Sequence, residues 1–106
     1  MRSWVEVSRS RIRENYRAVR ALVGDAAEIM PVVKADAYRH GAIEVSRILE
    51  SEGTTWLAVS NVEEGIALRN AGIAARILIM ADFLPEERAA LAEYQLTPVI
   101  DRKSVV

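Results

Sequence analysis

The chain has 106 residues, and its 14 Lys and Arg against 15 Asp and Glu leave a formal net charge of −1, which gives no electrostatic reason to expect nucleic acid or an anionic membrane as a partner. Its length fits one domain of ordinary size, its 51% of hydrophobic residues can build a core, and its lack of Cys excludes disulfides, thiolate zinc sites and cysteine nucleophiles. Because the apolar runs are too short to span a bilayer and the start has no secretory h-region, we expect a cytoplasmic location.

The N-terminal third is expected to hold an extended piece, a helix and a strand. Trp4–Ser8 has the character of a short extended segment. The helix that follows is expected to end at Gly24, and its apolar stripe consists of Ile12, Tyr16, Val19, Leu22 and Val23. Ile29–Val33 is a fully apolar run of strand length, and regular pairing is expected only after Pro31, which has no N–H to donate.

The rest of the chain alternates helices with apolar strands. The expected strands cover Trp56–Val59, Ile77–Met80 and Thr97–Ile100. Ala35–Gly41 is expected to be a loop, and an amphipathic helix is expected before each of the three strands.

Two of these helices begin with residues that are typical of helix N-termini. Ser60 or Asn61, followed by Glu63 and Glu64, has the spacing of a capping box. Pro85 followed by two glutamates suits the first turn of a helix, where Pro loses no hydrogen bond and acids meet the positive end of the helix dipole.

Continuous apolar strands separated by helices predict an α/β fold with a parallel sheet covered by helices. The choice lies between a doubly wound open sheet and a (β/α)8 barrel, and the absence of a Gly-rich fingerprint after the first strand disfavours a dinucleotide-binding domain. A complete barrel needs about 250 residues. We therefore expect residues 1–100 to form the N-terminal part of a (β/α)8 TIM barrel, about four βα units, which is incomplete.

The last six residues do not continue the pattern. Residues 101–106, Asp-Arg-Lys-Ser-Val-Val, back-translate in one frame to the start of a common sequencing adapter. We expect this segment to be a non-native tail and the natural chain to continue beyond Ile100; a natural short C-terminus is the alternative, and sequencing of the locus distinguishes the two.

Lys34 directly follows the first expected strand, and the other lysine of the chain is Lys103. In parallel α/β folds, ligands and chemistry lie at the carboxyl edge of the sheet. A deprotonated lysine amine can condense with an aldehyde, and the apolar residues before Lys34 favour the neutral amine. On position alone, a lysine that extends from a strand end into water is the simpler interpretation.

The stretch Val32–Gly41, VVKADAYRHG, closely resembles the VVKADAYGHG signature of the alanine racemase family, and the resemblance extends over Trp4–Ile100. That family consists of pyridoxal-phosphate-dependent enzymes of fold type III with an N-terminal (β/α)8 barrel. The resemblance implies racemisation of L-alanine to D-alanine for cell-wall peptidoglycan precursors. It also implies pyridoxal 5′-phosphate as cofactor, alanine as substrate and a homodimeric parent enzyme. No metal site is expected, because a single His and no Cys leave no transition-metal cluster.

The resemblance also implies roles for individual residues. Lys34 matches the lysine that holds the cofactor as an internal aldimine and then serves as one of two catalytic bases. Tyr38 matches the tyrosine whose hydroxyl hydrogen-bonds the cofactor phosphate, while Asp36 and His40 are expected to shape the loop. Arg39 stands where the family usually has Gly; it would cost about 1 kcal/mol or more if that position needs a positive φ, and otherwise it adds positive charge near the phosphate.

Two alternative functions stay open. One is a racemase of the same family that acts on another amino acid such as serine, because the residues that face the substrate mostly lie outside this chain. The other is a non-catalytic pyridoxal-phosphate-binding or interaction module. The opposing base of the family comes from the partner subunit's C-terminal domain, so we expect this chain alone to be inactive.

The first helix is rich in arginine. We expect these side chains to form a solvated face with salt bridges to acids such as Glu14, in preference to a nucleic-acid site; they are Arg9, Arg11, Arg13, Arg17 and Arg20.

Overall fold

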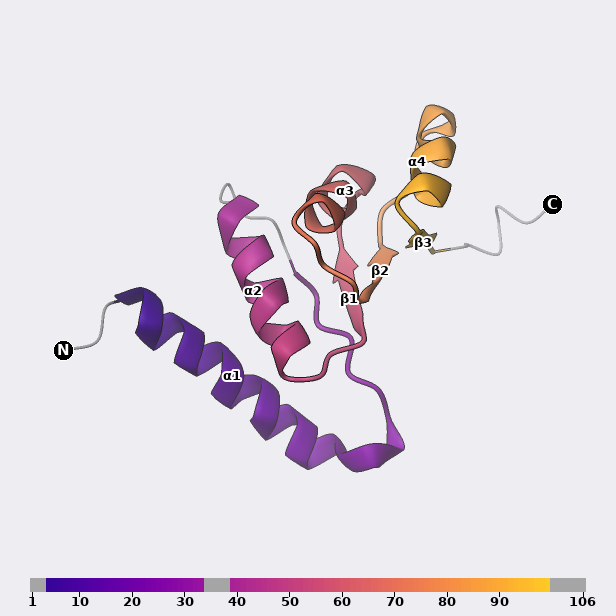
Figure 1. Cartoon of the computed structure of the whole chain (residues 1–106). Coiled ribbons are helices and arrows are strands. Elements are labelled where there is room, and N and C mark those ends of the chain that lie inside the picture. The colour runs from indigo at the N-terminus through magenta and orange to yellow at the C-terminus, as the bar shows by residue number, and fades with distance from the viewer. Residues whose placement is uncertain (1–3, 34–38, 100–106) are drawn as a thin grey trace.

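The computed structural model describes residues 4–33 and 39–99 of the chain, so the expected tail at 101–106 lies outside the described residues. Helices alternate with strands along the chain, and the strands form one parallel sheet (Figure 1). The parallel α/β class expected from the sequence is therefore confirmed.

The chain opens with helix α1 (Trp4–Val23) and the 3-10 helix η1 (Gly24–Ala26). The prediction of an extended Trp4–Ser8 is wrong, because α1 begins at Trp4. An extended segment needs a neighbouring strand to pair its backbone N–H and C=O groups, whereas a helix pairs them internally, and none of the described strands pairs with this segment. Gly24 ends α1 as expected, with a φ of +67°.

Three strands form the sheet: β1 (Trp56–Val59), β2 (Arg76–Ile79) and β3 (Leu96–Pro98). They pair in parallel in the order β1-β2-β3. All three lie where the sequence predicts strands, with small shifts at their ends.

The first expected strand, Ile29–Val33, is present only as a single bridge between Val32 and Ala58 of β1. Val33 N–H donates to Ala58 O at 2.8 Å, and Ala58 N–H donates to Pro31 O at 2.9 Å. Pairing thus begins at Pro31, whose ring nitrogen has no hydrogen to donate. Since β2 pairs with the other edge of β1, this segment lies on the far side of β1 from β2.

Helices α2 (Arg39–Ser51), α3 (Val62–Asn70) and α4 (Arg88–Glu93), the last preceded by the 3-10 helix η2 (Pro85–Glu87), lie on the same side of the sheet (Figure 1). Helix α3 contacts α2 on one flank and α4 on the other, and α1 lies against α2. The sheet therefore has one face covered by helices.

The two expected helix starts are confirmed. At α3, Asn61 Oδ1 accepts from Glu64 N–H at 2.9 Å, and Glu64 Oε1 accepts from Ser60 N–H at 2.7 Å. At η2, Glu87 Oε1 accepts from Leu84 N–H at 2.7 Å, directly before the proline that opens the turn. These contacts satisfy N–H groups that helix geometry leaves without partners.

The core lies between the sheet and the helix layer. Strand residues that face the helices are buried: Leu57, Val59, Ile77, Ile79 and Leu96. A Cβ added at Gly65 of α3 would lie 3.0 Å from methyl carbons of both Ile79 and Leu96, so α3 packs closely on this face because it has no side chain there.

Two charged side chains fix the connections near the amino ends of β2 and β3. Arg69 of α3 donates hydrogen bonds of 2.7 to 3.0 Å to four backbone carbonyl oxygens, those of Ile73, Ala75, Tyr94 and Gln95. Glu50 Oε2 accepts from the N–H groups of Ala74 and Ala75, each at 2.8 Å. Partial burial lowers the pKa of Arg69, although an arginine in a protein stays charged.

Candidate functional site

The carboxyl edge of the sheet is the place where a parallel α/β fold brings chemistry together. Val33, which is 3% exposed, is hydrogen-bonded to β1 and is the last residue of the first described range. Lys34 and Tyr38, the two predicted site residues, lie outside the described residues. The described structure thus reaches the carboxyl edge one residue before Lys34.

The chain segments that follow β1, β2 and β3 meet at the same edge. Met80 N–H donates to Val59 O at 2.9 Å, and Val99 N–H donates to Ile79 O at 3.2 Å, so pairing continues one residue past the strands. Ser60 lies here as well, with its N–H held by the α3 capping box. The edge therefore combines fixed backbone with the exposed apolar side chains of Met80 and Val99.

Helix α2 begins at Arg39, so the expected loop Ala35–Gly41 is wrong over its last three residues. His40 and Gly41 are helical, and the cost of one glycine in a helix, about 1 kcal/mol, is small beside the packing of a 13-residue amphipathic helix. Asp36 lies outside the described residues.

Arg39 carries no left-handed strain. It is helical, and Gln95 is the one non-glycine residue of residues 4–33 and 39–99 with a positive φ. The first turn of α2 contains no acidic residue, so the N–H groups at this helix start are electrostatically suited to an anion.

A cavity of about 220 Å³ lies at the opposite, amino edge of the sheet. Its walls include Tyr16 and Arg20 of α1, residues of the turn before Ile29, and Thr54 and Thr55 ahead of β1. Arg20 Nη1 contacts the Tyr16 hydroxyl at 3.4 Å. This cavity is separate from the edge that Val33 reaches, so it does not belong to the predicted site.

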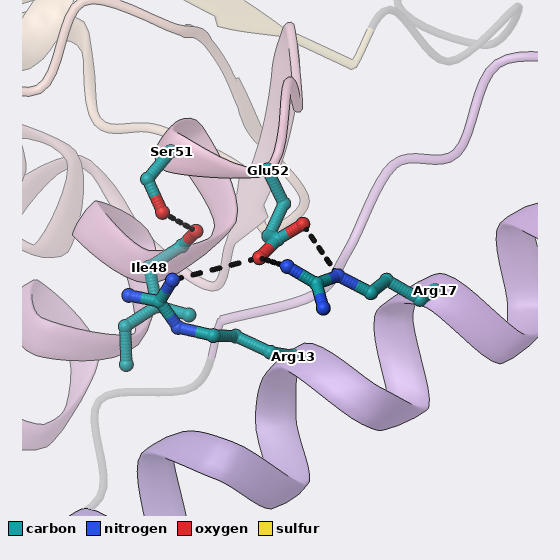
Figure 2. Close-up of polar contacts among 5 residues, drawn as sticks. All are labelled: Arg13, Arg17, Ile48, Ser51 and Glu52. Carbon is teal, nitrogen blue, oxygen red and sulfur yellow. Dashed lines mark hydrogen bonds and ion pairs between the residues drawn. The ribbon is translucent and has the colours of Figure 1, made fainter.

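Three arginines of α1 bind acids that lie on or just after α2, and Figure 2 shows the two that bind Glu52. Arg17 donates to Glu52 from Nε to Oε2 at 3.0 Å and from Nη2 to Oε1 at 2.8 Å, while Arg13 Nη1 lies 3.6 Å from Oε1. Arg9 Nη2 lies 2.8 Å from Glu44 Oε1. Hydrogen bonding by Arg17 holds the pKa of the Glu52 carboxyl below its ordinary value.

These pairs correct the prediction that Glu14 binds the arginines. Among the described residues, the ion-pair partners of α1 lie on or just after α2. Glu52 is 35 residues from Arg17, so no local spacing rule could have identified the pair. The salt-bridged arginine face expected from the sequence is present, and its ion pairs connect α1 to α2.

No group of three or more metal-ligating side chains occurs in the described part of the chain. Within that part, no helix is both long enough and apolar enough to cross a bilayer.

The parallel sheet with helices on one face places this chain in the α/β class of folds. The barrel domains of α/β enzymes are built from the same βα units. Residues 7–106 match the family described as "Alanine racemase, N-terminal domain". An alanine racemase of Carboxydothermus hydrogenoformans is 46% identical over 102 residues, which are 96% of this chain and 27% of that protein.

Solved structures agree with this match. An alanine racemase of Clostridium difficile 630 superposes with a TM-score of 0.78 and 36% identity, covering 84% of this chain and 23% of that one. An alanine racemase of Bacillus anthracis with bound L-Ala-P superposes with a TM-score of 0.81 and 32% identity, covering 90% and 25%. The chain therefore belongs to the alanine racemase family, and it spans about a quarter of the length of these relatives.

Proposed function

We propose that this chain is the opening part of the barrel domain of a pyridoxal-phosphate-dependent enzyme that interconverts L- and D-alanine. Residues 1–100 would supply about four of the eight βα units of the barrel. The observation that carries the proposal is the segment VVKADAY, which lies inside a family match that spans residues 7–106 and whose Val33 is hydrogen-bonded to β1.

The described residues around this position fit the proposed cofactor. Its phosphate needs N–H donors free of neighbouring acids, which the first turn of α2 offers. Its aromatic ring needs an apolar surface, which the half-exposed side chains of Met80 and Val99 offer at the same edge. Tyr38 precedes α2 by one residue, and we propose that its hydroxyl donates to the phosphate.

Lys34 is proposed as the residue that holds the cofactor and as one of two catalytic bases. In the sequence, Lys34 directly follows Val33, which is hydrogen-bonded to β1 at the carboxyl edge of the sheet. Bound pyridoxal phosphate supplies the electron sink that makes the α-proton of alanine acidic. The Lys34 amine then takes or returns that proton on one face of the substrate, and the second base comes from outside this chain.

The oligomeric state, the location and the substrate of the parent enzyme belong to the same proposal. We propose a homodimeric parent enzyme in the cytoplasm whose D-alanine enters peptidoglycan synthesis. Alanine is favoured over serine because the relatives reported above are named alanine racemases. A non-catalytic pyridoxal-phosphate-binding module remains the second candidate, and catalysis distinguishes it.

The test is a chimera in which residues 1–100 of this chain replace the matching segment of the Carboxydothermus hydrogenoformans enzyme. We expect the purified chimera, supplied with pyridoxal phosphate, to convert L-alanine to D-alanine. Lys34→Arg keeps the positive charge but removes the titratable amine, and it should lower kcat by at least about a thousandfold.

Two outcomes contradict the proposal. A chimera that folds, as judged by circular dichroism, and racemises equally well with Arg at position 34 would remove Lys34 from the chemistry. A folded chimera that binds pyridoxal phosphate without racemising alanine would favour the non-catalytic module.

A further inference from the structure

The cavity at the amino edge of the sheet, of about 220 Å³, is built by consecutive elements at the start of the chain. One wall consists of the end of α1, η1 and the turn that follows them, and the other wall is the turn between α2 and β1. The Arg17–Glu52 ion pair (Figure 2) ties the two walls together, because Glu52 directly precedes Gly53 of the second wall. The walls are therefore held in place by contacts within this chain.

Charged side chains of both signs line the cavity. Arg20 of α1 contributes a guanidinium group, and Asp25 and Glu28 contribute carboxylates from η1 and the turn after it. Within residues 4–33 and 39–99, the ion pairs are made by other side chains, and Arg20 Nη1 lies 3.4 Å from the Tyr16 hydroxyl. The cavity therefore holds charges of opposite sign that do not neutralise one another.

These charges suit a small ligand that carries both signs. A guanidinium group binds a carboxylate through two parallel N–H···O bonds, and Arg20 uses only one of its nitrogens on Tyr16. The N–H donors of an ammonium group suit the carboxylates of Asp25 and Glu28. Ile29, which lines the same cavity, adds apolar surface for an uncharged side chain. The cavity is smaller than the roughly 300 to 1,000 Å³ of pockets that hold drug-sized molecules, which favours a ligand of amino-acid size.

We propose that this cavity is a binding site for a free α-amino acid with an uncharged side chain. The carboxylate of the ligand binds Arg20, and its ammonium group binds Asp25 or Glu28. The site lies at the amino edge of the sheet, whereas the proposed cofactor site lies at the carboxyl edge that Val33 reaches. The inference therefore goes beyond the proposed racemase chemistry and does not depend on it.

The experiment is isothermal titration calorimetry of L-leucine into the chimera without cofactor and into the full 106-residue chain. We expect saturable one-to-one binding to both proteins. Absence of binding to the chimera overturns the proposal, even where the 106-residue chain binds, because the rest of the barrel would then occupy the cavity.

Two analogues of leucine test the requirement for both charges. 4-Methylpentanoate lacks the ammonium group, and isopentylamine lacks the carboxylate. Each should bind the chimera at least about tenfold more weakly than L-leucine, because a charged contact is lost. An analogue that binds as tightly as L-leucine would overturn the assignment of a zwitterion site.

A matched pair of variants of the chimera locates the site. Arg20→Gln removes the guanidinium group from the cavity and should weaken L-leucine binding by about tenfold or more. Arg11→Gln changes an exposed arginine of the same helix that does not line the cavity, and it should leave the binding unchanged. Equal effects of the two variants overturn the assignment of this cavity.

Racemase activity provides a separate readout. A chimera that binds L-leucine with the expected dependence on Arg20, but does not racemise alanine, supports this inference and contradicts the proposed function. A chimera that racemises alanine and does not bind L-leucine does the reverse. Arg20→Gln should leave the rate of racemisation unchanged, because the cavity is separate from the proposed catalytic edge.

Discussion

The guanidinium of Arg69 donates hydrogen bonds to four backbone carbonyl groups. Two of them lie in the loop before β2 and two in the loop before β3. Such charged hydrogen bonds contribute about 1.5 to 3 kcal/mol each, and their loss leaves carbonyl oxygens without partners. We expect Arg69→Met to lower the free energy of unfolding by about 3 kcal/mol. Urea denaturation followed by circular dichroism measures this difference.

Arg88→Met is the control for that measurement, because Arg88 is an exposed arginine on the neighbouring helix α4. It should change the free energy of unfolding by less than about 0.5 kcal/mol. Similar values for the two variants would show that the carbonyl contacts of Arg69 do not hold the connections.

Gly65 offers a second prediction at the level of one residue. An alanine Cβ would meet methyl carbons of Ile79 and Leu96 at 3.0 Å, in the buried core. Overpacking costs about 1 to 3 kcal/mol, and the gain in helix propensity returns up to about 1 kcal/mol. We expect Gly65→Ala to destabilise the fold by about 1 kcal/mol in thermal unfolding, and a stabilised variant would contradict the close packing of α3.

At the scale of elements, the arginine pairs to Glu44 and Glu52 hold α1 on α2, and Tyr16 of α1 is buried in the core. Exposed ion pairs contribute little singly, but Glu52 is 11% exposed and accepts two hydrogen bonds from one guanidinium. Glu52 is therefore the main polar contact between the two helices.

The lowered pKa of Glu52 predicts a pH dependence. A carboxyl group with a lower pKa in the folded state stabilises that state above its unfolded pKa, about 4.3, and loses this contribution as the pH falls below it. We expect Glu52→Gln to lower the Tm at pH 7 and to have a progressively smaller effect below about pH 4. Thermal melts across this range measure it.

Glu14→Gln, at an exposed position in the middle of α1, serves as the control and should leave the Tm unchanged at neutral pH. A Glu52→Gln effect that stays constant from pH 7 to about pH 3 would show that the carboxylate charge is not the stabilising feature.

Helices and strands could be predicted where residues close together in the sequence determine them. The strands at Trp56–Val59 and Ile77–Met80 and the capping box at Asn61 depend on contiguous residues, and the structure confirms them. The helix over Trp4–Ser8 and the Arg17–Glu52 pair depend on what lies beside α1 in space, which spacing along the chain does not reveal.

At the scale of the whole molecule, the alternation of apolar runs and amphipathic helices correctly indicated a parallel α/β layer. The site was predictable only as a motif: Lys34 and Tyr38 were identified by resemblance, and their placement lies outside the described residues.

The chain by itself is expected to have no racemase activity. Exchange of the α-proton between the two faces of alanine needs a base on each face, and the proposed site supplies Lys34 alone. Incubation of the purified chain with pyridoxal phosphate and L-alanine should leave D-alanine at the level of the cofactor-only control. D-alanine above that level would show that one base and solvent suffice.

The most direct measurement of the central claim is the location of the cofactor in the chimera. After loading with pyridoxal phosphate and reduction with borohydride, peptide mapping by mass spectrometry should find the pyridoxyl group on Lys34. An active chimera that carries the group on another lysine would contradict the assignment of Lys34 and the proposed function of this edge of the sheet.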